Sequence, residues 1–377
     1  MNNKINLGCS SIKLTSKNNN HYYFRTCDMN DEANIWKAGS VIVSYKKNHI
    51  FNFSNNNKII SKYSILGITY GNKFERLLDG INEKGLSGFL LHYLEGTSIE
   101  YQNINLSNIH IEGMEIITYF LSTCSNVIEV INLSKYITVT NIIHQNQILP
   151  ATMHYTFLDT SGDSVILEAD TNGQFKIHHK TVGVFTNSPS YTEHINNLSW
   201  YIASSLELNA LNKKNINKFI LDNIEIKGDK NKKPYQRNDI LPGSYTSTDR
   251  FIKLCTLKHL INCGKDYNDE EILLKGNEII SNVYVPKHQG YFYYNYILKD
   301  NKENATYKDH DINGKNIYGG GDNYTQYVVM YDLTNKSLYI KTDKSLIYDK
   351  INLKNQTSDI IIYSVNNNPK LGIINHN

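Results

Sequence analysis

Short runs in which polar and apolar residues alternate fill the first quarter of the chain, and Asn-, Lys- and Gly-rich turns separate them. This period of two residues is typical of antiparallel β-strands. It predicts strands over 22–24, 40–45, 65–70 and 88–93. The segment 79–86, with the sequence Asp-Gly-Ile-Asn-Glu-Lys-Gly-Leu, is rich in turn-forming residues, so we expect a turn that leads into the strand at 88–93.

Helices and further strands follow in blocks. Apolar residues at helical spacing predict a helix over 111–135. A capping box at 190–193 predicts a second helix that runs to about residue 208, and a third is predicted from about 246–248 to Gly264. The later strands are predicted over 152–157, 164–168, 174–179, 326–332 and 337–342.

The order of these elements is strands, helices, strands, helices, strands, with tight antiparallel turns. This differs from the regular alternation of strand and helix that builds a parallel sheet, and it favours an α+β fold in which two antiparallel sheets pack face to face with helices outside. The chain has no internal repeat and no Pro- or Gly-rich linker. We therefore expect one domain, with the polar stretch 209–240 as a variable loop.

Composition and charge argue against several classes of protein. A hydrophobic share of 40% in 377 residues allows a large core, and a net charge of +3 without a clustered basic face argues against nucleic-acid binding. No apolar run approaches the ~18 residues of a membrane span. The five cysteines are odd in number and form no CxxC pair, which favours a reducing, cytoplasmic environment over a disulfide framework.

Cofactor sites are not expected. His178 and His179 are adjacent on a predicted strand, so they face opposite sides and cannot chelate one metal ion. No spacing of His, Cys and carboxylates resembles a zinc site, and neither a GxGxxG motif nor a P-loop is present. We expect no metal, no nucleotide and no organic cofactor.

The leading candidate for chemistry is Cys9, which follows a short polar leader, Met1–Gly8, that lacks the apolar region of a secretory signal. Taken alone, Cys9 fits a small hydrophobe near a chain end. If the leader is removed, the freed α-amine titrates near ~7.7–8.0 and the thiol near ~8.5. One residue then carries both a nucleophile and its base, which is the minimum for nucleophilic catalysis.

Arg25 and Asp28 lie three residues apart at a predicted strand end. They fit a surface ion pair of little energetic worth. They also fit a catalytic arrangement in which Arg25 stabilises the Cys9 thiolate and Asp28 holds the α-ammonium group. Cys27 lies between them, and we expect it to be buried and inert.

Two later segments carry further candidates. Asn187, in Thr186-Asn187-Ser188-Pro189, fits either a plain turn or an amide donor that stabilises an oxyanion. Arg250 is a cation in the first turn of a predicted helix, where the helix dipole is mildly unfavourable to it. An ion pair with Asp249 would give a structural reason for a cation at this position. A role in the active site would also explain why the chain keeps a cation where the helix dipole disfavours one.

With these segments in view, the chain resembles the choloylglycine hydrolase family of N-terminal-nucleophile amidases, which holds the penicillin V acylases and the conjugated bile salt hydrolases. The resemblance runs from Cys9 to about residue 353 and is weakest at 209–240 and 301–322. Several of its segments are closer in sequence to the penicillin V acylases than to the bile salt hydrolases. The segments that carry it, in order, are Cys9-Ser10-Ser11, Arg25-Thr26-x-Asp28, Asp79-Gly80-x-Asn82-Glu83-Lys84-Gly85-Leu86, Thr186-Asn187-Ser188-Pro189, and Leu241-Pro242-Gly243 with Arg250-Phe251.

The resemblance implies a four-layer αββα fold and a site in which Cys9 is the nucleophile and its amine is the base. It places Arg25, Asp28, Asn187 and Arg250 at active-site positions. The family's other oxyanion residue, usually Tyr or Asn, falls on His92. A neutral imidazole N–H can still donate a hydrogen bond, but it adds a titrating group. If the alignment with the family is shifted by one residue, this position falls on Tyr93 instead. Because side chains alternate along a strand, Tyr93 would face the opposite side from His92.

The same resemblance implies hydrolysis of a linear amide in a small-molecule acyl substrate, without a cofactor, nucleic acid or membrane, by a homo-oligomer that is often a tetramer. It also implies that residues 1–8 are a propeptide removed autocatalytically and that 9–377 form the mature domain. Two alternatives stay open. One is an unprocessed member that only binds small molecules, and the other is an enzyme acting on fatty-acyl amides or acyl-homoserine lactones.

Overall fold

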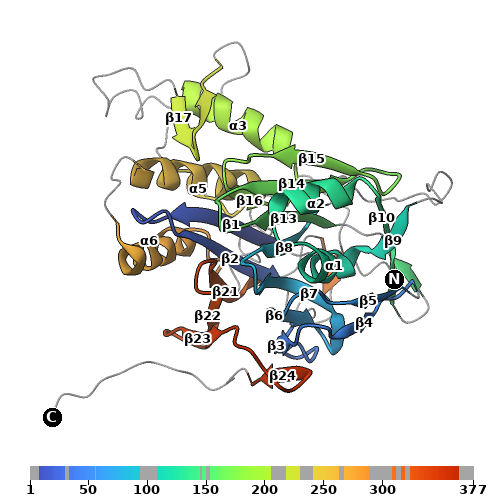
Figure 1. Ribbon diagram of the computed structural model, residues 1–377. Coiled ribbons are helices and arrows are strands. Elements are labelled where there is room, and N and C mark those ends of the chain that lie inside the picture. The colour runs from blue at the N-terminus through green and yellow to red at the C-terminus, as the bar shows by residue number, and fades with distance from the viewer. Residues whose placement is uncertain are drawn as a thin grey trace.

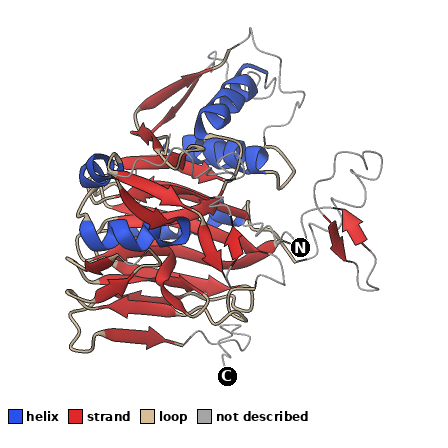
Figure 2. Ribbon diagram, turned by 90° about the vertical axis from the view of Figure 1, so that its right-hand side faces the viewer, coloured by secondary structure: helices blue, strands red, loops and turns tan. Residues whose placement is uncertain are grey.

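A computed structural model gives the structure of residues 8–29, 34–55, 57–93, 108–144, 147–149, 153–204, 218–229, 241–262, 267–287, 308–310, 316–318 and 323–364. Within these ranges the chain forms a strand-rich body with helices on its outside (Figures 1 and 2). No helix among these residues is both long and apolar enough to cross a bilayer.

Two large antiparallel sheets form this body. The six-stranded sheet has the order β16 (Val184–Thr186), β1 (Gly8–Thr15), β2 (His21–Met29), β21 (Tyr324–Asp332), β22 (Ser337–Thr342) and β23 (Asp349–Asn352). The eight-stranded sheet has the order β15 (Phe175–His179), β14 (Ser164–Ala169), β13 (Met153–Leu158), β8 (Ser87–His92), β7 (Lys73–Asn82), β6 (Ile65–Tyr70), β3 (Ile42–Tyr45) and β24 (Ile360–Tyr363).

Helices cover the outer faces of the sheets. Helices α5 (Ser247–Asn262) and α6 (Asp269–Ser281) pack on β1 of the six-stranded sheet, while α1 (Ile116–Thr123) and α2 (Val127–Ser134) pack on the eight-stranded sheet (Figure 1). Helix α3 (Tyr191–Ser204) packs on α5. The result is the four-layer αββα arrangement, which confirms the predicted α+β fold class.

Smaller elements complete the described chain. They are the pairs β4 (Ile50–Asn52) with β5 (Lys58–Ile60), β9 (Ile109–Glu112) with β10 (Ile137–Thr140), β11 (Ile142–His144) with β12 (Gln147–Leu149), β17 (Lys218–Leu221) with β18 (Ile224–Lys227), β19 (Lys308–His310) with β20 (Asn316–Tyr318), and the short helix η2 (Gly113–Glu115).

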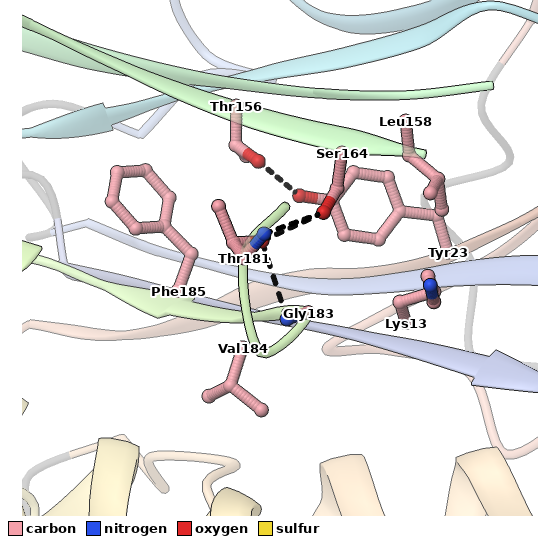
Figure 3. A pocket seen from close by; sticks show the side chains of 9 residues that line it. All are labelled: Lys13, Tyr23, Thr156, Leu158, Ser164, Thr181, Gly183, Val184 and Phe185. Atoms are coloured by element: carbon pink, nitrogen blue, oxygen red, sulfur yellow. Dashed lines mark hydrogen bonds between the residues drawn. The ribbon is translucent and has the colours of Figure 1, made fainter. Parts of the chain in front are cut away.

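The core lies between the two sheets and contains aromatic and polar groups. The rings of Tyr23 and Phe89, from opposite sheets, stack with centroids 4.1 Å apart. Figure 3 shows a small gap nearby whose polar groups bond one another: Tyr23 Oη lies 2.6 Å from Thr156 Oγ1, and Ser164 Oγ lies 2.8 Å from Thr181 Oγ1. Because these groups are satisfied internally, the gap is part of the core rather than a ligand site.

Most predicted elements are confirmed, and three predictions need correction. The helix predicted over 111–135 is two helices, because Cys124 is extended and Asn126 caps α2 by accepting from Glu129 N. Residues 79–82 continue strand β7, so the predicted turn is confined to the residues after Asn82. The predicted loop 209–240 contains the β17–β18 hairpin, and its other described part is residues 228–229.

Two predicted boundaries, at residue 208 and at Gly264, lie outside the described residues. One helix was missed. Helix α6 begins with a complete capping box, in which the Asn268 side chain accepts from Glu271 N and the Glu271 side chain accepts from Asn268 N. That pattern is readable in the sequence, so local sequence could have revealed the helix.

Candidate active site

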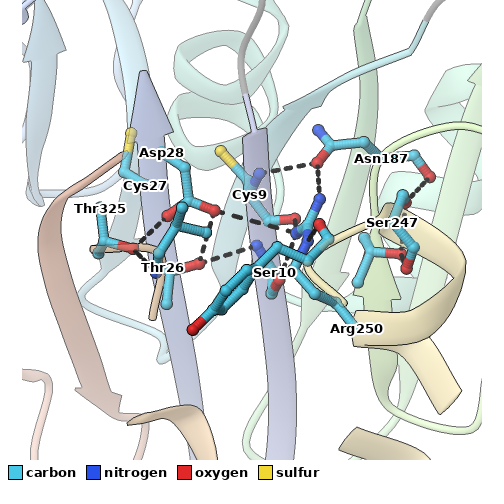
Figure 4. Close-up of polar contacts among 12 residues, drawn as sticks. Cys9, Ser10, Thr26, Cys27, Asp28, Asn187, Ser247, Arg250 and Thr325 are labelled. Atoms are coloured by element: carbon cyan, nitrogen blue, oxygen red, sulfur yellow. Dashed lines mark hydrogen bonds and ion pairs between the residues drawn. The ribbon is translucent and has the colours of Figure 1, made fainter. Parts of the chain in front are cut away.

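Cys9 is the second residue of β1 and is fully buried. Its backbone N–H donates to Asn187 Oδ1 at 2.8 Å, and its carbonyl oxygen accepts from Arg250 Nη1 at 2.6 Å (Figure 4). Arg25, from the neighbouring strand β2, holds its Nη2 3.2 Å from the Cys9 sulfur. The structure thus brings Cys9, Arg25, Asn187 and Arg250 into direct contact, although the sequence separates them by up to 241 residues.

Arg25 is fully buried in the layer between the sheets. Its Nη1 donates to Asp79 Oδ2 at 2.6 Å and to the Leu78 carbonyl at 2.7 Å, while Nη2 also donates to the Leu90 carbonyl at 2.9 Å. These contacts fix the guanidinium beside the thiol. They exclude the alternative that Arg25 and Asp28 form an exposed surface pair.

The surroundings of Cys9 favour its thiolate. Burial raises the pKa of the Cys9 thiol, but a hydrogen bond from Cys27 and the positive charge of Arg25 outweigh it and lower the pKa from 9.0 to about 7. Burial raises the pKa of Cys27 well above its ordinary value. Near neutral pH, Cys9 is therefore the ionised member of the pair and Cys27 keeps its proton.

Arg250 lies in the first turn of α5 but reaches away from the helix toward β1. Nη1 lies 2.5 Å from Ser10 Oγ, and Nη2 donates to Asn187 Oδ1 at 2.8 Å. Asp249, the structural partner considered from the sequence, accepts a short hydrogen bond from Ser244 Oγ. Arg250 thus links α5 to the beginning of β1 and to the end of β16.

Asn187 is held on every side. Its Oδ1 accepts from both Cys9 N and Arg250, and its Nδ2 donates to the His92 carbonyl at 3.1 Å. Its own backbone carbonyl accepts from His194 Nε2 at 2.8 Å and from Ser247 Oγ at 2.9 Å. These contacts orient the amide with its oxygen toward the Cys9 nitrogen.

His92 is the last residue of β8, and the Asn187 contact brings this strand end next to the site. Tyr93, the alternative from the sequence, stacks on His154 with ring centroids 4.7 Å apart. The Tyr93 ring is therefore committed to a packing contact. An oxyanion role for the His92 ring stays a prediction.

Asp28 is buried at the end of β2. Its Oδ1 accepts from Thr325 Oγ1 at 2.6 Å, and its Oδ2 lies 3.4 Å from Thr26 Oγ1 and 3.9 Å from Arg250 Nη1. Burial raises the pKa of Asp28. Gly8 is its strand partner, and a Cβ on Gly8 would lie only 3.0 Å from Asp28 Cβ. The Gly8–Cys9 peptide bond consequently runs beside the Asp28 side chain.

Comparison with known proteins identifies the family. Residues 9–310 match the family model of linear amide C–N hydrolases, choloylglycine hydrolase family. The chain belongs to this family. It is 26% identical over 280 residues to a bile salt hydrolase/transferase from Clostridium perfringens, covering 73% of this chain and 78% of that protein. It is 29% identical over 123 residues to a penicillin V acylase from Pectobacterium atrosepticum, covering 31% of each.

Solved structures agree on the fold. A variant of conjugated bile acid hydrolase from Clostridium perfringens superposes with a TM-score of 0.73 at 22% identity, covering 97% of this chain and all of the other. Penicillin V acylase from Agrobacterium tumefaciens gives a TM-score of 0.59 at 19% identity, covering 92% and 86%. The protein is thus an enzyme of the choloylglycine hydrolase family, whose members hydrolyse linear amides.

Three residues that hold the candidate active-site side chains in place were not predicted from the sequence. Asp79 pairs with Arg25 and also accepts from Tyr327 Oη and Tyr331 Oη, each at 2.5 Å. Asp79 lay within a motif that the sequence analysis quoted without assigning it a role. Ser247 and Thr325 each bond a candidate residue, and neither was assigned a role from the sequence.

The described residues contain no group of three or more His, Cys, Asp or Glu side chains placed to hold a metal ion. His178 and His179 bond different carboxylates: His178 Nε2 lies 2.9 Å from Glu168 Oε2, and His179 Nε2 lies 2.8 Å from Asp163 Oδ2. The two rings therefore contact separate carboxylates, as strand alternation predicts.

Proposed function

We propose that this enzyme cleaves an acyl amide through Cys9 as an N-terminal nucleophile, with a thioester intermediate. One observation supports the proposal: the sulfur and the nitrogen of Cys9 each have a buried polar partner within hydrogen-bond distance. The sulfur lies 3.2 Å from Arg25 Nη2, and the nitrogen is held 2.8 Å from Asn187 Oδ1. A thiol with a pKa of about 7 is a substantial thiolate at neutral pH.

The proposal requires removal of Met1–Gly8. While Gly8 is attached, the Cys9 nitrogen is a peptide amide and cannot accept a proton. Removal would leave an amine at the same place, with Asn187 Oδ1 as an acceptor for one N–H and Asp28 close to the vacated Gly8 position. A residue larger than glycine at position 8 would crowd the Asp28 side chain, so this carboxylate lies directly beside the bond that the proposal requires to be cleaved.

In the proposed reaction, the Cys9 thiolate attacks the acyl carbon and the carbonyl oxygen becomes an oxyanion. Asn187 Nδ2 and the His92 ring are the proposed donors to it, and each such donor is typically worth about 3–4 kcal/mol. The Cys9 ammonium group then protonates the leaving amine. A water molecule, deprotonated by the Cys9 amine, cleaves the thioester and releases the acid.

We propose an apolar acyl group as the preferred substrate part. Aromatic rings surround Arg25, which contacts the sulfur: its guanidinium carbon lies 5.7 Å from the Phe89 ring centroid and 5.9 Å from that of Tyr327. Trp36 packs on Tyr327 at 5.7 Å. An aromatic surrounding close to the thiol favours an apolar acyl group over a charged one. The names of the relatives suggest conjugated bile salts and penicillin V as first substrates. A cytoplasmic location and a homotetramer are further expectations.

Two measurements on purified protein test the proposal. Intact mass and amino-terminal sequencing should give a chain that begins at Cys9. Phenoxyacetyl, glycine-conjugated bile and long-chain acyl amides, assayed side by side, should show hydrolysis of at least one, with none by Cys9→Ser. Hydrolysis by a chain that still begins with Met1 would refute the amine mechanism. A full-length chain that binds but does not cleave these amides would instead support the unprocessed binding protein.

A further inference from the structure

Cys27 lies directly opposite Cys9 on the neighbouring strand (Figure 4). The N–H and carbonyl of Cys9 are directed away from β2, to Asn187 and Arg250 respectively. A strand residue sends both backbone groups to one side, so Cys9 and Cys27 form a non-hydrogen-bonded antiparallel pair. In such pairs the Cα atoms are about 4.5 Å apart and the side chains approach most closely.

This pair geometry is compatible with a disulfide. Disulfides span Cα separations of about 4.4–6.8 Å. Both sulfurs already share one partner, because Arg25 Nη2 lies 3.2 Å from Cys9 Sγ and 3.8 Å from Cys27 Sγ. The two thiols are also chemically unequal: a hydrogen bond from Cys27 helps to lower the pKa of Cys9, while burial keeps Cys27 protonated. Cys9 is therefore the member of the pair that reacts first with an oxidant.

We propose that Cys9 and Cys27 form a reversible disulfide when the protein meets hydrogen peroxide or another hydroperoxide, with Cys27 as the resolving cysteine. The Cys9 thiolate attacks the peroxide oxygen, an S–O bond forms, and the O–O bond breaks. Hydroxide, or alkoxide from an organic hydroperoxide, leaves and takes up from solvent the proton that the Cys9 thiol released when it ionised. Cys9 is now a sulfenic acid. The Cys27 sulfur then attacks Cys9 Sγ, the S–S bond forms, the S–O bond breaks, and the leaving hydroxide takes the Cys27 proton as a second water.

Two electrons pass from the thiol pair to the peroxide, so the step balances. A dithiol reductant reverses it. The consequence is protection, because a sulfenic acid that is captured as a disulfide does not proceed to the irreversible sulfinic acid. This role replaces the expectation that Cys27 is inert. It depends on the arrangement of the two sulfurs and does not depend on amide hydrolysis.

Peptide mapping tests the proposal without any activity assay. Purified protein is treated with a small molar excess of hydrogen peroxide, alkylated with iodoacetamide in denaturant, and digested with trypsin. Cleavage after Lys13 and Arg25 places the two cysteines on separate peptides. We expect one cross-linked pair that joins them, a fall from five alkylatable thiols to three, and full recovery after dithiothreitol.

Two variants sharpen the test. Cys27→Ser should give no cross-link, and its Cys9 should accumulate as sulfinic acid that dithiothreitol does not restore. Cys124→Ser is the matched control; Cys124 is a buried thiol whose pKa burial raises to about 12, so the cross-link should persist there. Wild-type Cys9 that becomes sulfinic acid while Cys27 stays alkylatable would overturn the proposal, as would Cys9 that peroxide leaves unmodified. If Cys27→Ser fails to fold, the wild-type map alone decides.

Discussion

The buried ion pair between Arg25 and Asp79 permits a quantitative prediction for Asp79→Asn. Both side chains have no exposed surface, and the Asp79 carboxylate accepts from Arg25 at 2.6 Å and from two tyrosine hydroxyls at 2.5 Å. Asparagine keeps the shape but removes the charge. Arg25 is then a buried cation whose remaining hydrogen-bond acceptors among the described residues are two carbonyls and two cysteine sulfurs.

Removing one partner of a buried ion pair typically costs about 3–5 kcal/mol. We expect Asp79→Asn to reach the lower end, about 3 kcal/mol, because the Cys9 thiolate can serve as a substitute counter-charge. The same change in a Cys9→Ser background should cost more, since no thiolate remains. Equilibrium unfolding in guanidinium chloride, followed by circular dichroism, measures both free energies.

Asp163→Asn is the matched control. Asp163 pairs with His179 near the surface, where both side chains are partly exposed, so its loss should cost less than about 1 kcal/mol. A cost for Asp79→Asn no larger than that of the control would show that Asp79 does not neutralise Arg25. It would also remove the physical reason for a stable guanidinium beside the thiol.

Three further predictions concern catalysis. Cys9→Ser should abolish hydrolysis and leave the melting temperature nearly unchanged; residual turnover would exclude the thiol mechanism. The thiolate absorbance of Cys9 should rise with pH through a midpoint of about 7, because the folded state favours the ionised thiol; a midpoint near 9 would mean that Arg25 and Cys27 do not stabilise it. His92→Ala should lower kcat by about 10²–10³ with little change in KM if the ring donates to the oxyanion. An effect on KM alone would argue against that donor.

Local sequence patterns were sufficient for most of the fold. The strand at 65–70 and the strands and helices around 153–204 follow from alternation, turn residues and caps, which act within a few residues. The single helix predicted over 111–135 was wrong, and the reason also lies in the local sequence. Apolar spacing continued across residues 124–126, but the Asn126 side chain favours starting a new helix over continuing the old one.

The site was harder to predict because its contacts join distant segments. Arg250 was noticeable from the sequence as a cation in a first helical turn, and in the structure it spans from α5 to Cys9 and Asn187. The role of Asp79 was not readable. Its pairing with Arg25 depends on how β7 of one sheet lies over β2 of the other, and no pattern within either strand specifies that.

The contacts of Cys9 bear on how leader removal would activate the enzyme. Its carbonyl and its nitrogen are already fixed by Arg250 and Asn187 while Gly8 is still attached. Cleavage would therefore change the charge and basicity of the nitrogen and need not change its position. An ammonium group has three N–H donors. Asn187 Oδ1 accepts from only one of them, so holding the group firmly requires a second acceptor. The Asp28 carboxylate, whose strand partner is Gly8, is the charged group placed to accept. In the intact chain the Asp28 carboxylate already lies 3.9 Å from Arg250 Nη1, so cleavage would add a second cation, the Cys9 ammonium, to its surroundings.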